Sequence, residues 1–483
     1  MIVLAAFFVN ALTNFAIGLM VAKFLGPDEY GRFALAVALG LVVQAFVFDW
    51  IRLSAVRFYS NKTREEEPQV RATLDVAFAA LAILVGLGGA LFLLAGGGFG
   101  LSHVLIALAL ATSIVNGLFD YSTGLVRAAF NDGLYGRLLL VKNGLSLALT
   151  TGGAFVFRSA ELALLGAIVS IVGSMMITRA GLTDVANTPL RASAWRARAY
   201  LAYSAPIVTA NLLYLLAPLV NRTIAAHAYG FAETGQFSLA FDLGFRALQA
   251  MGSALDVLLF QLAVAARETH GVERGRAQVG SNIAIVLAVV APAAVGMWFT
   301  LPSVEALLAP AEFRGPFGRY LTLMLPGLAA LVLILFAINP IFQIEKKTWP
   351  MIAAGLIGAA GAPLIFWLLP KTADASSLAL AQSGAYGAAL VALVALTRAV
   401  EPRWPPARDF LAIGAALAAM CATLAALAGL APGAQTLAAQ IAAGAGVYVL
   451  AAVALDVARL RAPVLARVRR IAAACKSFNK SLL

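Results

Sequence analysis

One long apolar segment of the chain carries polar residues at helical spacing. The segment FDLGFRALQAMGSALD covers residues 241–256. Its polar members are Asp242, Arg246, Gln249, Ser253 and Asp256. The steps of 4, 3, 4 and 3 between them place all five on one face of a helix. Such a face, with two acids, a guanidinium, an amide and a hydroxyl, has the side chains needed to bind an anion and to exchange a cation or a proton.

Similar faces occur elsewhere in the chain. The segment SIVNGLFDYSTGLVR places Ser113, Asn116, Asp120, Thr123 and Arg127 on one side of a helix. Another apolar segment carries Asp49 and Arg52 three residues apart, and a third carries Asn211, Asn221 and Arg222. Within a bilayer each ionised side chain costs about 2.5–3.5 kcal/mol on the mildest scale, so it normally faces a cavity or a partner.

The chemistry of these residues favours an anionic ligand. Guanidinium groups suit phosphate and pyrophosphate, and exclusion of water strengthens the contact. The predicted substrate-binding residues are Arg52, Arg222, Arg246, Asn211 and Gln249. The residues predicted for ion coupling or charge pairing are Asp49, Asp120, Asp242 and Asp256. A purely structural role stays open, because Asp49–Arg52 and Asp242–Arg246 have the spacing of helix-surface ion pairs.

The elements that must position these side chains are membrane-spanning helices. The chain is 62% hydrophobic and only 12% charged, with a mean hydropathy of +0.90. Apolar runs long enough to cross a bilayer recur from one end to the other. The predicted spans are 3–24, 33–56, 73–95, 101–124, 139–157, 161–178, 201–224, 236–262, 278–300, 319–342, 350–370, 376–397, 409–430 and 435–456. We therefore expect an all-α polytopic membrane protein with about 14 transmembrane helices.

Several other classes of function are disfavoured. Two cysteines and three scattered histidines offer no metal site, and no phosphate-binding loop or other cofactor motif is present. The net charge of +12 does not indicate nucleic acid, because most lysines and arginines follow even-numbered spans or lie in the C-terminal tail. That distribution predicts that both termini are cytoplasmic.

A repeated motif divides the chain. Residues 24–36 read FLGPDEYGRFALA and residues 228–240 read AYGFAETGQFSLA. The matched pairs are Gly26/Gly230, Glu29/Glu233, Gly31/Gly235, Phe33/Phe237, Leu35/Leu239 and Ala36/Ala240. Six spans separate the copies, so the repeat predicts two parallel, pseudo-symmetric six-helix halves. The expected domains are 1–180, 181–400, two extra C-terminal helices at 401–458, and a basic cytoplasmic tail at 459–483.

The motif LGPDEYGRFALA resembles the signature that follows the first helix of polysaccharide flippases, members of the multidrug/oligosaccharidyl-lipid/polysaccharide (MOP) exporter superfamily. The segment FDWIRLSAVRFYS resembles the end of that family's second helix, with Asp49 and Arg57 at the acid and arginine positions and Trp50 and Ile51 where small residues are usual. The resemblance implies a multi-pass protein of the bacterial inner membrane that moves undecaprenyl-pyrophosphate-linked oligosaccharides outward by alternating access. It further implies coupling to H⁺ or Na⁺ and an association with polysaccharide-assembly proteins.

Alternatives remain at this level. A multidrug or peptidoglycan-precursor exporter of the same superfamily would share the fold, although the arginines disfavour cationic drugs. A membrane-integral glycan polymerase would need a large outer loop and a nucleophile with its base, and the sequence provides neither. A channel or scaffold without a transport cycle is the other alternative.

Overall fold

The computed structural model describes residues 2–60, 66–67, 69–183 and 192–457, with the backbone alone for residues 2–8 and 257. All regular secondary structure in these ranges is helical. Within the described ranges thirteen helices are long and apolar enough to cross a membrane. One of them, α1 (Ile2–Val47), consists of two helices joined at Gly26, where φ is 73° and Pro27 follows. The expected 14 spans and the all-α class are thus confirmed.

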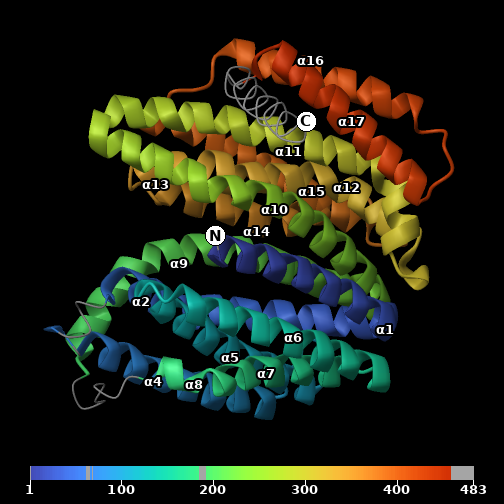
Figure 1. Ribbon diagram of the computed structural model, residues 1–483. Coiled ribbons are helices and arrows are strands. Elements are labelled where there is room, and N and C mark those ends of the chain that lie inside the picture. The colour runs from blue at the N-terminus through green and yellow to red at the C-terminus, as the bar shows by residue number, and fades with distance from the viewer. Residues whose placement is uncertain (1, 61–65, 68, 184–191, 458–483) are drawn as a thin grey trace, which may run out of the picture. The chain divides into compact units, whose positions relative to one another are not determined.

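The order of the helices follows the predicted spans closely (Figure 1). After α1 come α2 (Asp49–Phe58), α4 (Gln69–Leu94), α5 (His103–Ala128), α6 (Asp132–Phe157), α7 (Ala160–Ile177), α8 (Arg179–Leu182), α9 (Ala194–Tyr229), α10 (Phe231–His270), α11 (Val272–Leu308), η2 (Ala311–Phe313), α12 (Pro316–Leu333), η3 (Ile334–Ile338), α13 (Asn339–Ile344), α14 (Trp349–Leu368), α15 (Ser376–Leu396), η4 (Thr397–Val400), α16 (Ala407–Ala426) and α17 (Ala434–Ala454). Several helices run beyond the predicted spans, because single residues such as Gly230 and Gly271 separate them where longer loops were expected.

By its internal contacts the chain forms two compact units. The first comprises Met1–Leu243, Ala309–Met324 and Thr348–Ala389, and the second comprises Gly244–Leu308, Leu325–Lys347 and Leu390–Leu483. The boundaries pass through α10, α12 and α15, so they do not coincide with the division at residue 180 predicted from the repeat. That domain division stays a prediction, and the predicted tail 459–483 lies outside the described residues.

The first unit contains both copies of the repeated motif, and they touch each other. A Cβ atom added to Gly31 would lie 2.0 Å from the carbonyl oxygen of Phe231, and one added to Gly235 would lie 2.0 Å from that of Pro27. The contact is reciprocal, since each glycine meets the residue four positions before the other glycine. Only a residue without a side chain allows backbones to approach so closely. This is the contact that a pseudo-twofold axis between the two copies requires.

The matched acids of the motif also perform parallel tasks. Glu29 accepts a hydrogen bond of 2.8 Å from the backbone N–H of Ala160, at the start of α7. Glu233 accepts from the hydroxyl of Tyr320, and that hydroxyl accepts from the backbone N–H of Ala375 just before α15, at 3.2 Å. Each acid therefore satisfies, directly or through a tyrosine, an N–H group at the beginning of a helix.

The second unit is built around α11. The hydroxyl of Tyr448 in α17 donates to the carbonyl oxygen of Ala288 in α11 at 2.7 Å, and α16 lies beside both helices (Figure 1). The side chain of Asn282 in α11 donates to the carbonyl oxygen of Leu259 in α10 at 2.7 Å. These bonds between helices satisfy polar groups that would be costly in lipid.

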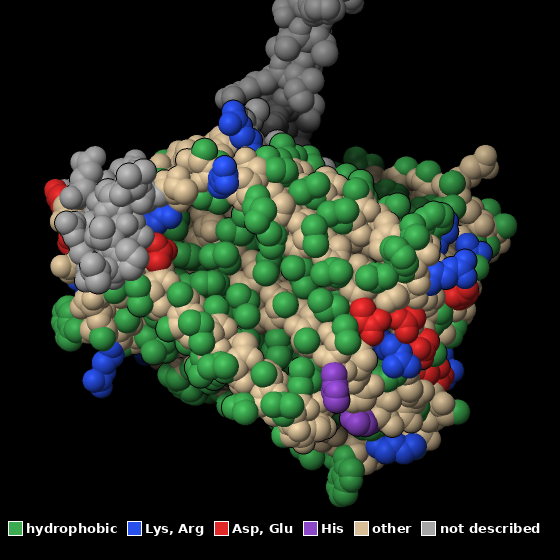
Figure 2. All heavy atoms as spheres, turned by 90° about the horizontal axis from the view of Figure 1, so that it is seen from below, with side chains coloured by type: hydrophobic (Ala, Val, Ile, Leu, Met, Phe, Trp, Pro, Cys, Tyr) green, Lys and Arg blue, Asp and Glu red, His purple; other side chains and the backbone are tan. Residues whose placement is uncertain are grey.

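The surface is suited to lipid. In the face shown in Figure 2, hydrophobic side chains cover the middle, whereas most charged side chains gather toward two opposite edges. On α4 the side chains of Ile83, Leu84 and Leu91 are 62%, 63% and 68% exposed. A soluble protein rarely exposes such a continuous apolar surface, and a bilayer would cover it. The molecule is a multi-pass membrane protein.

Candidate functional site

One cluster of charged residues gathers where α1 gives way to α2. The Nε atom of Arg52 lies 3.1 Å from Oδ1 of Asp49, and the guanidinium interacts electrostatically with Asp120 of α5 as well. Gln44 donates a 2.7 Å hydrogen bond to the carboxylate of Asp120. Lys142 of α6 adds a second positive charge near Asp120. We call these five residues the α5 charge cluster.

The local sequence explains why this cluster forms. The helix breaks at Phe48, so Asp49 begins α2 and its carboxylate lies at the positive end of the new helix. Glycines on α5 let this junction approach closely, because a Cβ on Gly117 would lie 2.9 Å from Phe48 and one on Gly124 would lie 3.6 Å from Arg52. Two acids and two bases then share one polar region, in which Asp49 and Arg52 form an ion pair and Asp120 lies within electrostatic reach of both bases.

A second cluster lies around Arg222 of α9, whose side chain is almost fully buried. Its Nη1 atom donates to the carbonyl oxygen of Ala34 at 3.0 Å, and its Nη2 atom lies 2.6 Å from Oδ1 of Asp242. The buried Tyr386 of α15 lies close enough to interact electrostatically with Arg222, and its hydroxyl makes no hydrogen bond to any described residue. The buried amide of Asn221 makes no hydrogen bond to any described residue, as is typical where water or a ligand is present.

The structure brings together some of the predicted site residues. Asp49, Arg52 and Asp120 lie in the α5 charge cluster, and Arg222 pairs with Asp242. The i,i+3 pair Asp49–Arg52 forms as its spacing predicts. Asp242 instead finds its partner on α9, whereas its spacing offered Arg246 on its own helix.

Other predicted residues are not members of these two clusters. Arg246, Gln249 and Asp256 are on the part of α10 that belongs to the second unit, where Arg246 is exposed. Asn211 is exposed on α9. The roles of these residues, like those of the two clusters, stay predictions.

Sequence reasoning missed Gln44 and Lys142. Gln44 is a lone polar residue in an apolar span, and Lys142 lies at the edge of one, so neither has a helical neighbour that points to Asp120. The available signal was their rarity inside membrane spans, which marks such residues for a partner. Their positions beside Asp120 depend on the packing of α1 and α6 against α5.

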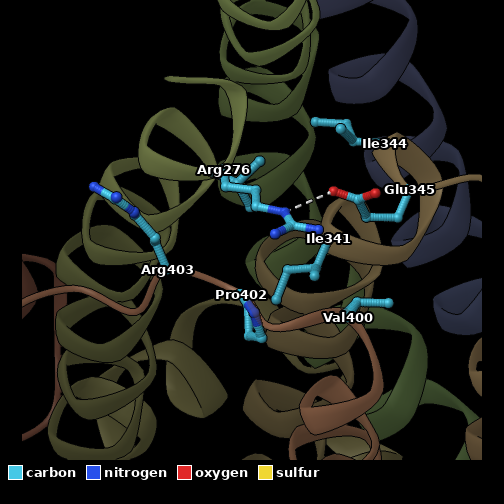
Figure 3. Close-up of a pocket in the computed structure, with 8 residues that line it drawn as sticks. Arg276, Ile341, Ile344, Glu345, Val400, Pro402 and Arg403 are labelled. Carbon is cyan, nitrogen blue, oxygen red and sulfur yellow. Dashed lines mark hydrogen bonds and ion pairs between the residues drawn. The ribbon is translucent and has the colours of Figure 1, made fainter. Parts of the chain in front are cut away.

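A third set of charges lies in the second unit, and Figure 3 shows one of its ion pairs, between Arg276 and Glu345. Glu345 at the end of α13 lies 3.2 Å from Arg267 of α10 and 3.1 Å from Arg276 of α11. Glu273 lies 3.6 Å from Arg276 and 3.0 Å from Arg403, which is in the segment before α16. This chain of ion pairs holds four elements at one membrane face and was not predicted. Among the described residues no three His, Cys, Asp or Glu side chains gather that could hold a metal ion.

Comparisons with known proteins identify the fold. No protein-family model matches the chain, and no curated protein matches its sequence. Among solved structures, lipid II flippase MurJ in an inward closed conformation is similar with a TM-score of 0.68 and 15% sequence identity, covering 94% of this chain and 98% of that chain. A multidrug resistance MATE family transporter of the MOP superfamily is similar in its inward-facing conformation, with a TM-score of 0.58 and 16% sequence identity. The match covers 81% of this chain and 94% of that chain. The outward-facing conformation of a transporter with the same description is similar with a TM-score of 0.52 and 15% sequence identity. That match covers 83% of this chain and 93% of that chain.

Proposed function

We propose that this chain, which has the fold of the MOP exporters, moves an undecaprenyl-pyrophosphate-linked oligosaccharide from the inner to the outer leaflet of a bacterial inner membrane. The observation that carries the proposal is the position of arginines within membrane-spanning helices of this fold. Arg222 lies in the membrane-spanning α9 and pairs with Asp242, and Arg52 at the start of the short α2 pairs with Asp49. Intramembrane charges of this kind mark a pathway for a charged substrate.

The substrate suits these side chains. A pyrophosphate carries negative charge that planar guanidinium groups bind through paired hydrogen bonds. In the proposed cycle Arg52, Arg222 and Arg246 contact the head group, while Asn211 and Gln249 contact the sugar. Asp49, Asp120, Asp242 and Asp256 neutralise these arginines when no substrate is bound, and they exchange H⁺ or Na⁺ during the cycle. The polyprenyl chain stays in the bilayer throughout.

The remaining features of the proposal follow from the fold. Alternating access moves the head group across the membrane without a covalent step, so no catalytic residue is required. The solved structures with a similar fold named above are transporters. Both termini are proposed to face the cytoplasm, where polysaccharide-assembly proteins are the expected partners.

A second candidate substrate has its own support. The fold is similar over nearly the whole chain to lipid II flippase MurJ, so a peptidoglycan precursor is the alternative ligand. A pyrophosphate and a polyprenyl chain are common to both kinds of substrate, and the arginines would serve either. The glycan distinguishes them, and transport assays with each substrate decide between them.

Transport by purified protein tests the proposal. In proteoliposomes the wild-type protein should transfer a polyprenyl-pyrophosphate-linked oligosaccharide to the opposite leaflet, where an added glycosidase digests it. Arg246→Ala should abolish this transfer, and Arg246→Lys should retain part of it because the charge remains but the planar fork does not.

The control is Arg274→Ala, which removes an exposed arginine at the start of α11 and should leave transfer unchanged. Normal transfer by Arg246→Ala at equal protein level would remove Arg246 from the site. Transfer of lipid II alone would establish the second candidate, and transfer of neither substrate would reject both.

A further inference from the structure

The first unit contains a cavity of about 220 Å³ among the ends of several helices, and none of its lining residues belongs to either charge cluster. Its buried floor includes Tyr59, Tyr121 and Leu125, and its mouth includes the exposed residues Asn131 and Thr183. The helices α4 and α6 begin here and α5 and α7 end here. The cavity therefore lies at the depth of lipid head groups and opens through a polar mouth.

Two opposite charges lie in the wall of this cavity. They are Arg71 and Asp75, one turn apart on α4, with side chains 18% and 32% exposed. The Nε atom of Arg71 is 3.6 Å from Oδ2 of Asp75, which is too long for a direct hydrogen bond. The hydroxyl of Tyr121 holds the other oxygen of Asp75 at 2.5 Å, and Arg71 Nη2 donates to the carbonyl oxygen of Leu182 at 2.7 Å. Both charges are thus fixed in position.

The chemistry of the cavity selects a small zwitterion. Arg71 and Asp75 are the charged residues among those that line it, so its net charge is zero and a pyrophosphate dianion would meet the carboxylate as well as the guanidinium. A phosphodiester suits the guanidinium, an ammonium suits the carboxylate, and the rings of Tyr59 and Tyr121 offer cation–π contacts. The volume is below that of typical pockets for drug-sized ligands and suits a head group rather than a glycan.

We infer that this cavity binds the phosphoethanolamine head group of a membrane phospholipid, with the phosphate at Arg71 and the ammonium at Asp75. The apolar part of the wall, which includes Leu118, Leu134 and Met175, covers the first carbons of the lipid. The bound lipid joins α4, α5, α6 and α7 at one membrane face. This inference does not depend on the proposed transport function.

Native mass spectrometry of the full-length protein tests the inference. The protein is exchanged into an equimolar mixture of phosphatidylethanolamine, phosphatidylglycerol and phosphatidylcholine with identical acyl chains. The wild type should retain one phosphatidylethanolamine about tenfold in preference to the others, the ratio expected when one charge-assisted hydrogen bond is lost. Asp75→Asn should remove that preference and favour phosphatidylglycerol, because Arg71 then lacks its opposing charge.

The matched control is Glu67→Gln. Glu67 pairs with Arg196 at 2.5 Å near the same helix ends but does not line the cavity, so this variant should keep the wild-type preference. Ser122→Phe fills the cavity from its floor and should lose the lipid without losing the melting transition. An equal lipid profile for the wild type, Asp75→Asn and Ser122→Phe would overturn the inference, as would equal binding of soluble glycerophosphoethanolamine at the lipid's concentration.

Discussion

At the scale of single residues, Asp242 is the counter-ion of a guanidinium that has almost no access to solvent. Asp242→Asn would leave the charge of Arg222 buried without compensation. Removing one partner of a buried pair costs about 3–5 kcal/mol, and the partial exposure of Asp242 places this case at the lower end. We expect a clear fall in the melting temperature of the detergent-purified protein.

The control for this substitution is Asp28→Asn. Asp28 pairs with Arg32 at 3.0 Å, the side chain of Asp28 is 54% exposed, and Arg32 keeps Glu29 as a second partner, so the loss should be within about 1 kcal/mol. An equal melting temperature for both variants would mean that Arg222 has another source of charge compensation. Combined replacement of Arg222 by Met and Asp242 by Leu should restore most of the stability, because it leaves no buried charge.

At the scale of helices, the reciprocal glycine contact predicts that a methyl group added at Gly31 destabilises the protein, whereas one added at a glycine outside the contact does not. Gly31→Ala places a Cβ atom against the carbonyl oxygen of Phe231, so the two helices must separate, at a cost of about 1–3 kcal/mol. Gly144→Ala in α6 meets nothing within 4 Å and should be neutral or stabilising by about 0.5–1 kcal/mol. Thermal unfolding of both variants measures the difference, and equal curves would contradict the contact.

Hydropathy alone located these helices, because length and composition suffice to identify a bilayer-crossing segment. The spacing of Asp49 and Arg52 also predicted their pair, since both lie on one helix. Spacing could not predict the pair of Arg222 with Asp242, because the two residues lie on different helices. In the sequence, Asp242 has a nearer basic residue, Arg246, on its own helix. Gln44 and Lys142 were missed for the same reason. Partners across helices are set by packing, which periodicity does not encode.

At the scale of the whole molecule, the transport proposal requires that the polar face of α10 be reached by water. Single cysteines at positions 246, 249 and 253, in a background without Cys421 and Cys475, should react with a membrane-impermeant thiol reagent. Cysteines at Met251 and Leu258, which are exposed apolar positions of the same helix, should react much more slowly if those positions face lipid. Equal labelling of the two sets would reject the water-filled pathway and with it the transporter assignment.

The meeting of Gly31 and Gly235 has a consequence for motion. At these two glycines the backbones of the two helices touch directly, so neither position has a rotamer to order when the helices come together or to release when they part. At these positions the entropic cost of closing the interface is therefore lower than for a contact between two side chains. The two copies of the motif could therefore separate and rejoin at this contact during a transport cycle with little rearrangement of side chains. A single added methyl group at either glycine would keep the two backbones apart.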